Sequence, residues 1–315
     1  MGQILVTVET DAGLAGYGVG GGGAAGIHVV RTVLRDLLMG RSPENVEALW
    51  REMYRATLPF GRKGLAVMAF SGVDLALWDL RGKAQSKPVA ELLGGRVGEP
   101  IPTYITLHAG LEKCLEKGFR AFKADLAFGN PNPSLEAVVE HVFGVREKIG
   151  PECDLMFDAF MKWDVETALR GAEAMAPARL EWFEEPLPPD DLDGYAALAE
   201  RSPIPIAGGE HEYAPVGFAE IVKRRLHQVI QPDICWCGGM TTLVEVYRMA
   251  KEAGLRVCPH RGAEVWGLHA IAALDPSPLA ESGRHWMTWV KGQPPIENGF
   301  IRLTDAPGFG AGIER

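Results

Sequence analysis

The sequence predicts an α/β protein in which a small α+β module is followed by a (β/α) barrel. Two observations support this prediction. The first 98 residues combine one hairpin pattern with helical spacing of apolar residues, whereas from residue 101 onward a short apolar strand, a loop and an amphipathic helix recur. Strands that alternate with helices pair in parallel, and eight such repeats over roughly 200 residues favour a closed barrel over an open sheet.

The N-terminal module, residues 1–98, opens with a predicted hairpin. Residues 3–10 alternate apolar and polar side chains, residues 11–13 provide a turn, and residues 14–18 return as the second strand. The closing segment, residues 299–315, alternates again like a strand, and we expect it to complete this module. Apolar residues spaced three and four apart predict helices at residues 31–38, 43–57 and 63–85.

The glycine-rich run at residues 18–23 contains the spacing G-x-G-x-x-G, which occurs in dinucleotide-binding proteins. In those proteins the motif opens a βαβ unit, whereas here it follows a hairpin strand. We therefore interpret the run as a flexible glycine loop and expect no bound dinucleotide.

The barrel is predicted to span residues 99–298. Because active sites of such barrels lie at the C-terminal ends of the strands, we expect ionisable side chains at those ends to converge on one pocket. The eight predicted strands are residues 102–107, 120–124, 154–158, 180–184, 204–208, 228–233, 255–260 and 278–281. The ionisable residues that end or closely follow them are Asp158, Glu184, Glu210, Asp233, His260 and Glu281.

Asp158, Glu184 and Glu210 come from three consecutive predicted strands. Three carboxylates cannot all stay ionised side by side without a cation, because like charges at contact distance raise one another's pKa. A ligand set made only of oxygen favours Mg²⁺, or Mn²⁺, over zinc. The alternative is that one or two of these acids cap the helices that follow them, but their regular spacing favours the metal site.

Asp233 and His260 end neighbouring predicted strands. A carboxylate beside an imidazole fixes its tautomer and raises its basicity, as a general base near neutral pH requires. A histidine at a strand end is otherwise commonly a packed or capping residue, so the hypothesis depends on the neighbouring carboxylates. A base beside a hard dication suits removal of the proton next to a carboxylate, because the metal stabilises the enediolate that forms.

Several segments resemble the mandelate racemase branch of the enolase superfamily, and most closely its L-rhamnonate dehydratase-like group of acid-sugar dehydratases. The resemblance extends over nearly the whole chain. It implies a modified TIM barrel, (β/α)7β-like, with an N-terminal α+β capping domain. It also implies a further strand and a specificity loop ahead of Met1, so we expect the capping domain to be truncated at its N-terminus. The segments are VDLALWDLRGK at 73–83, WFEEPLPP at 182–189, GGEH at 208–211, QPDICWCGGMTTLVE at 231–245 and PGFG at 307–310.

The resemblance also implies roles for residues at the predicted strand ends. A loop-capping role for Asp125 stays open, and Glu185 is expected to be a structural neighbour. The implied roles are Mg²⁺ ligands for Asp158, Glu184 and Glu210, an acid/base dyad for His260 and Asp233, a donor to a substrate carboxylate oxygen for Glu281, and substrate contacts for Lys123, His211 and Asp125.

One departure from the family pattern concerns the second predicted strand. Many relatives carry K-x-K at its end, with the second lysine as a base on the opposite face of the substrate, whereas this chain has Lys123-Ala124-Asp125. Inverting a stereocentre requires a base on each face, so a single base favours dehydration. We expect His260 to take the C2 proton of an aldonate and to help the C3 hydroxyl leave as water, giving a 2-keto-3-deoxy sugar acid.

Other functions stay open at this point. An epimerase or racemase would use the same fold and metal, and a catalytically silent homologue would have the fold without turnover. A zinc hydrolase on a similar barrel needs paired histidines at an early strand end, where His108 stands alone.

Composition limits the partners of the chain. The formal net charge of −9 is spread without long acidic or basic runs, which argues against nucleic acid. No stretch approaches the roughly 20 apolar residues of a membrane span, and the N-terminus lacks a signal-peptide pattern. Five cysteines, an odd number, argue for a reducing compartment. We expect a cytoplasmic homo-oligomer that binds a small sugar acid and no membrane.

Overall fold

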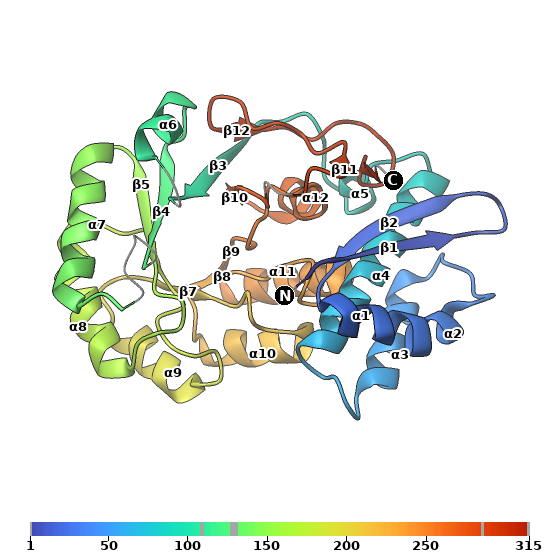
Figure 1. The fold of residues 1–315 in the computed structure, drawn as a ribbon, viewed down its shortest axis with the longest axis horizontal. Helices are drawn as coiled ribbons and strands as arrows, with labels where there is room; N and C mark the ends of the chain where they lie inside the picture. The colour runs from blue at the N-terminus through green and yellow to red at the C-terminus, as the bar shows by residue number, and fades with distance from the viewer. Residues whose placement is uncertain (1, 108–109, 127–131, 285–286, 314–315) are drawn as a thin grey trace.

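Figure 1 shows the computed structural model of the chain. It describes residues 2–107, 110–126, 132–284 and 287–313, so His108, the lone histidine of the zinc alternative, lies outside the described residues. The N-terminal elements, drawn in blue, gather on one side of a curled sheet, and the C-terminus lies close to them (Figure 1). Within the described ranges no helix is both long and apolar enough to cross a membrane.

The predicted N-terminal hairpin is confirmed. Strands β1 (Ile4–Glu9) and β2 (Ala15–Gly20) pair antiparallel, and Gly13, at φ 79°, lies in the turn between them. The hairpin packs on α4 (Leu65–Ala84), whose other side contacts the barrel helix α11 (Gly239–Ala253). Because α4 has neighbours on both sides, it is buried along almost its whole length, as its apolar sequence requires.

The other helices of the N-terminal module begin close to the predicted positions, with one exception. α3 (Val46–Thr57) starts after Asn45, whose side chain accepts a hydrogen bond from the backbone of Ala48 at 3.0 Å and so caps the helix. The helix predicted at residues 31–38 begins earlier and includes a π-helical turn. Its parts are α1 (Gly23–Val29), the π-helical turn (Val30–Leu34) and α2 (Arg35–Leu38); the module then ends with α5 (Val89–Leu92).

The prediction of a flexible glycine loop at residues 18–23 is wrong. Gly18 and Gly20 belong to β2, and α1 begins directly at the end of the run. The absence of side chains lets the strand lie against the backbone of α4. A Cβ on Gly18 would lie 2.1 Å from the carbonyl oxygen of Gly72, and one on Gly20 would lie 2.4 Å from that of Met68. These glycines therefore serve close packing.

The eight predicted barrel strands are all present and pair in parallel. The hydrogen-bonded order is β10-β3-β4-β5-β6-β7-β8-β9, so the strands curl into a barrel in sequence order, and β10 returns to β3. The strands are β3 (Ile101–Thr106), β4 (Ala121–Asp125), β5 (Asp154–Asp158), β6 (Phe183–Glu184), β7 (Ile206–Gly208), β8 (Val229–Ile230), β9 (Arg256–Val257) and β10 (Ala280–Glu281).

A helix follows each of the first seven barrel strands. In the part of the chain that the structure describes after β10, no helix follows, which confirms the predicted (β/α)7β architecture. The helices are α6 (Leu111–Glu116), α7 (Leu135–Ile149), α8 (Val165–Met175) with a 3₁₀ turn (Ala176–Ala178), α9 (Leu192–Arg201), α10 (Ala214–Arg224), α11 and α12 (Val265–Leu274).

The alternation of side chains along the barrel strands places the acidic residues at the strand ends above the apolar interior of the barrel. Side chains alternate along a strand, so a residue two positions beyond an interior residue points into the same space, closer to the C-terminal edge. Met156 is thus followed by Asp158, and Trp182 by Glu184. The interior apolar cluster consists of Tyr104, Ala121, Met156, Trp182, Ala207, Val229, Cys258 and Leu279.

The C-terminal segment contacts both the barrel and the N-terminal helices. β12 (Phe300–Ile301) pairs antiparallel with β3, and β11 (Val290–Lys291) pairs with β13 (Gly312–Ile313). Phe309 donates its backbone N–H to the side chain of Asp79 on α4 at 2.9 Å. The division of the chain at residue 98, with residues 299–315 assigned to the capping domain, stays a prediction.

Candidate active site

The predicted site residues lie together at the C-terminal edge of the barrel. Gly209, at φ 118°, turns the chain sharply after β7 and brings the next residue to this edge. Asp158, Glu184 and Glu281 end β5, β6 and β10; Lys123 and Asp125 lie on β4; Glu210, His211, Asp233 and His260 lie in the loops after β7, β8 and β9.

Lys123 stands among three carboxylates. Its ammonium nitrogen Nζ lies 2.5 Å from Glu184 Oε1, 3.0 Å from Glu281 Oε1 and 3.7 Å from Asp158 Oδ2. Burial alone would lower the pKa of Lys123, but the negative charges of Glu184 and Glu281 outweigh it and raise the pKa well above its usual value. Lys123 therefore stays a cation, and it can donate hydrogen bonds to an anionic substrate group.

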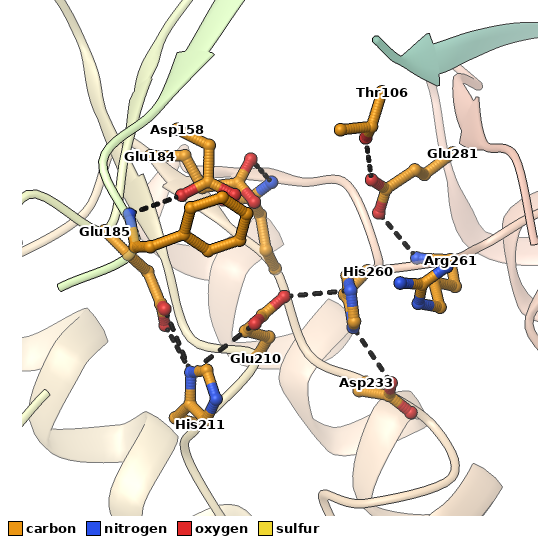
Figure 2. A network of polar contacts seen from close by, with 12 residues as sticks. Thr106, Asp158, Glu184, Glu185, Glu210, His211, Asp233, His260, Arg261 and Glu281 are labelled. Atoms are coloured by element: carbon orange, nitrogen blue, oxygen red, sulfur yellow. Dashed lines mark hydrogen bonds and ion pairs between the residues drawn. The ribbon is translucent and has the colours of Figure 1, made fainter. Parts of the chain in front are cut away.

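His260 connects two carboxylates, as Figure 2 shows. Its Nδ1 lies 2.9 Å from Asp233 Oδ2, and its Nε2 lies 2.9 Å from Glu210 Oε2. Burial alone would lower the pKa of His260, but the charge of Glu210 and the hydrogen bond with Asp233 raise it to about 10. An ionised carboxylate only accepts hydrogen bonds, so in this arrangement both ring nitrogens of His260 carry protons.

A second histidine lies on the other side of Glu210. His211 Nδ1 is 2.9 Å from Glu185 Oε2 and 3.5 Å from Glu210 Oε1 (Figure 2). The indole of Trp236 lies near both histidine rings, with ring centroids 6.0 Å from His211 and 5.5 Å from His260. Glu185, which we expected to be a structural neighbour, therefore holds the ring of His211.

The donor role that the resemblance implies for Glu281 stays a prediction. Its Oε1 accepts a hydrogen bond from Thr106 Oγ1 at 2.9 Å, and its Oε2 accepts one from the backbone of Arg261 at 2.8 Å (Figure 2). Burial alone would raise the pKa of Glu281, but the positive charge of Lys123 outweighs it and lowers the pKa. Glu281 therefore contacts Lys123 and accepts hydrogen bonds from Thr106 and from the backbone of Arg261.

Two overlapping sets of side chains could hold a metal ion. Glu185, Glu210 and His211 each place one ligand atom within 4.8 Å of the others, but Glu185 and His211 already bond to each other. In the predicted set of Asp158, Glu184 and Glu210, burial and the charge of Glu184 raise the pKa of Asp158 well above its usual value. A further positive charge at this set would relieve that repulsion, and three carboxylates fit Mg²⁺ or Mn²⁺.

Behind the dyad lie two buried residues that the sequence did not indicate. Arg284 lies beyond β10, and its guanidinium group bonds to Asp233 and to Glu264. Burial alone would raise the pKa of Asp233, but Arg284 and His260 lower it to about 2. Neither Arg284 nor Glu264 ends a strand or lies in a motif, so no spacing in the sequence could have connected them to the site.

Family comparisons agree with the fold and the site. Residues 2–94 match the mandelate racemase / muconate lactonizing enzyme N-terminal domain, and residues 107–315 match the enolase C-terminal domain-like family. These matches, the parallel barrel and the carboxylate-rich strand ends define an enolase-like barrel protein. The chain belongs to the mandelate racemase / muconate lactonizing enzyme family, as the motifs predicted.

Individual relatives carry more specific names. The chain is 37% identical to a protein named L-rhamnonate dehydratase from Saccharopolyspora erythraea, over 98% of this chain and 83% of the relative. The solved structure of L-rhamnonate dehydratase from Gibberella zeae is 32% identical, with a TM-score of 0.91 over 99% of this chain and 83% of that one. A racemase from Streptomyces coelicolor A3(2), solved with bound magnesium, is 33% identical, with a TM-score of 0.90 over 99% and 89%.

Proposed function

We propose that this protein is a Mg²⁺-dependent dehydratase of a sugar acid, an aldonate similar to L-rhamnonate. The observation that carries the proposal is the arrangement of His260, whose Nδ1 is fixed by Asp233 while its Nε2 faces the carboxylate edge of the barrel. The names of the dehydratases that the chain resembles support the substrate class.

Asp158, Glu184 and Glu210 would hold the metal, with Mn²⁺ as a substitute. Trp182 Nε1 and Gln231 Nε2 donate to Glu184 Oε2 at 3.1 Å and 2.7 Å, which fixes that carboxylate beneath the site. Bound Mg²⁺ would supply positive charge that stabilises negative charge on the substrate carboxylate, and it would offset the charge of Glu210, which raises the pKa of His260.

The side chains of the protein supply the proton transfers. Lys123 donates to the substrate carboxylate and so orients C2, and His211, held by Glu185, contacts a substrate hydroxyl. The Nε2 atom of neutral His260 takes the C2 proton, leaving an enediolate. His260 then gives this proton to the C3 hydroxyl as the C3–O bond breaks, so water leaves and the enol product becomes the 2-keto-3-deoxy acid. Asp233 keeps the imidazole oriented through both transfers.

A racemase or epimerase is the second candidate, because one similar solved structure is named a racemase. Inversion needs an acid or base on the face opposite His260. β4 ends in Asp125, buried and level with Asp158 in the strand register, where the two-base pattern has a lysine. A carboxylate is a much weaker base than a neutral lysine amine, so the dehydration by His260 alone is the better supported reaction.

Turnover of an aldonate library tests the proposal. The protein is incubated with L-rhamnonate and other aldonates in Mg²⁺ and ²H₂O, and formation of 2-keto-3-deoxy acids is followed with a colorimetric assay and by NMR. His260→Asn is the matched control, because the amide cannot act as a base. Deuterium at C2 with no loss of water would show the racemase or epimerase instead. A folded, Mg²⁺-binding protein that neither dehydrates nor exchanges any aldonate would refute both.

A further inference from the structure

A buried arginine links the acid/base dyad to a second carboxylate that no part of the proposed mechanism uses. Arg284 places one guanidinium nitrogen 2.5 Å from Asp233 Oδ2 and another 2.6 Å from Glu264 Oε2. The side chains of all three residues are at most 3% exposed. Glu264 lies just before α12, and its Oε1 accepts the backbone N–H of Arg284 at 2.9 Å. The arginine is therefore held at two points by one carboxylate.

The bonds around Asp233 leave its carboxylate no freedom to rotate. Oδ1 accepts the backbone N–H of Cys235 at 2.8 Å, and Oδ2 accepts from both Arg284 and His260. The planar guanidinium group holds its two bonding nitrogens at fixed positions relative to each other, so the bond of one nitrogen to Glu264 fixes where the other meets Asp233 Oδ2. Without Arg284, the donors to the Asp233 carboxylate among the described residues would be Cys235 and the histidine that Asp233 orients.

Arg284 supplies positive charge to two buried carboxylates at once. Asp233 and Glu264 are both buried, and Arg284 is the cation that contacts each of them. Removing one partner of a buried ion pair leaves an uncompensated charge, which moves toward solvent or takes up a proton. Either change would alter the carboxylate that His260 Nδ1 contacts. Arg284 also lies over the indole of Trp236, 5.3 Å from its centroid, and this packing restricts the guanidinium group further.

We propose that Arg284, anchored by Glu264, is a positioning residue for proton transfer, because it fixes the Asp233 carboxylate that orients His260. The proposal rests on the proposed function for the role of His260. It predicts that the arginine contributes to the rate of proton transfer through its contact with Asp233.

The test compares three variants. Arg284→Met removes the cation that Asp233 and Glu264 share and could fail to fold, so the main variant is the double change Arg284→Met with Glu264→Gln. It removes both charges, and the amide oxygen of Gln can still accept from the backbone at position 284. Arg284→Lys keeps a cation without the planar fork. Arg146→Met is the control, because that arginine bonds only backbone carbonyls at the end of α7, away from the site.

We expect the double variant to fold, to lose about 10- to 100-fold in kcat, and to keep KM and Mg²⁺ affinity within about threefold of wild type. Arg284→Lys is expected to recover part of the loss. Arg146→Met is expected to lower Tm and leave kcat unchanged, which separates positioning from general destabilisation. A folded double variant with wild-type kcat would overturn the proposal.

A crystal structure of the double variant tests whether Arg284 positions Asp233, and this test does not depend on enzymatic activity. The expected result is a rotated Asp233 carboxylate and a lengthened contact with His260 Nδ1, which is 2.9 Å in the wild type. An unchanged carboxylate and contact would overturn the positioning role, whatever the kinetics. If the wild type dehydrates no aldonate, the proposed function fails, and this structural comparison still decides whether Arg284 positions the dyad.

Discussion

His269 on α12 should make the stability of the protein depend on pH. Its Nδ1 accepts the backbone N–H of Ala90 at 3.0 Å, so the neutral ring carries its proton on Nε2, which lies 3.3 Å from the carbonyl oxygen of Phe309. The ring thereby joins the end of the N-terminal module, the barrel and the C-terminal segment. Burial lowers the pKa of His269 from 6.5 to about 4, because the charged ring would lose its hydration; protonation of Nδ1 would also leave the backbone N–H of Ala90 without its acceptor.

The sign and size of the effect follow from this shift. The pKa of His269 is 6.5 in the unfolded chain and about 4 in the folded protein. Between these two pH values His269 is mostly protonated in the unfolded chain and mostly neutral in the folded protein, so acidification favours unfolding. The contribution of His269 is therefore complete above that range and is lost as the pH falls through it. At about 1.36 kcal/mol per pKa unit the full loss is about 3 kcal/mol, of which about 2 kcal/mol falls between about pH 8 and about pH 5.

Urea denaturation of the wild type and His269→Gln at both pH values measures this loss. Glutamine can accept from Ala90 and donate to Phe309 without titrating, so we expect the variant to stay close to wild type at the higher pH and to lose about 2 kcal/mol less on acidification. If the free energy of unfolding fell equally in the two proteins, His269 would bind a proton as readily in the folded protein as in the unfolded chain.

Three further predictions concern the site and the fold. His260→Asn should lower kcat by at least about 10²-fold while calorimetry finds nearly unchanged Mg²⁺ affinity, and normal turnover would exclude His260 as the base. Glu184→Gln should weaken Mg²⁺ binding first, so activity lost at low Mg²⁺ should partly return at high Mg²⁺; unaltered affinity in calorimetry would remove Glu184 from the ligand set. Gly18→Ala should lower the free energy of unfolding by about 1–3 kcal/mol, because its Cβ would meet the backbone of Gly72; an unchanged urea midpoint would contradict the close packing of β2 on α4.

The barrel fold, and the residues that lie at the C-terminal ends of its strands, could be predicted from the sequence because both depend on local periodicity. The repeating strand and helix pattern fixes the parallel barrel, and in such a barrel each strand end is bound to face the same edge. Asp158, Glu184 and His260 could therefore be placed together although they are far apart in the chain. The motifs added the family, which the comparisons confirm.

Contacts between segments without periodicity could not be predicted in the same way. The close approach of the β2 glycines to α4 depends on how two elements dock, so the glycine run by itself indicates only a loop. The contact of Glu281 with Lys123 could not be predicted either, because it joins β10 and β4, which lie on either side of β3 only after the barrel has formed.

The amino-acid sequence by itself determined which carboxylates and which histidine stand at the mouth of the barrel. Only the tertiary structure decided their partners: Arg284 and Glu264 behind Asp233, Glu185 beside His211, and Lys123 among the acids. The reason is physical. Strand periodicity sets the direction of a side chain, whereas its charge state and orientation depend on the buried groups that other segments bring within hydrogen-bond distance.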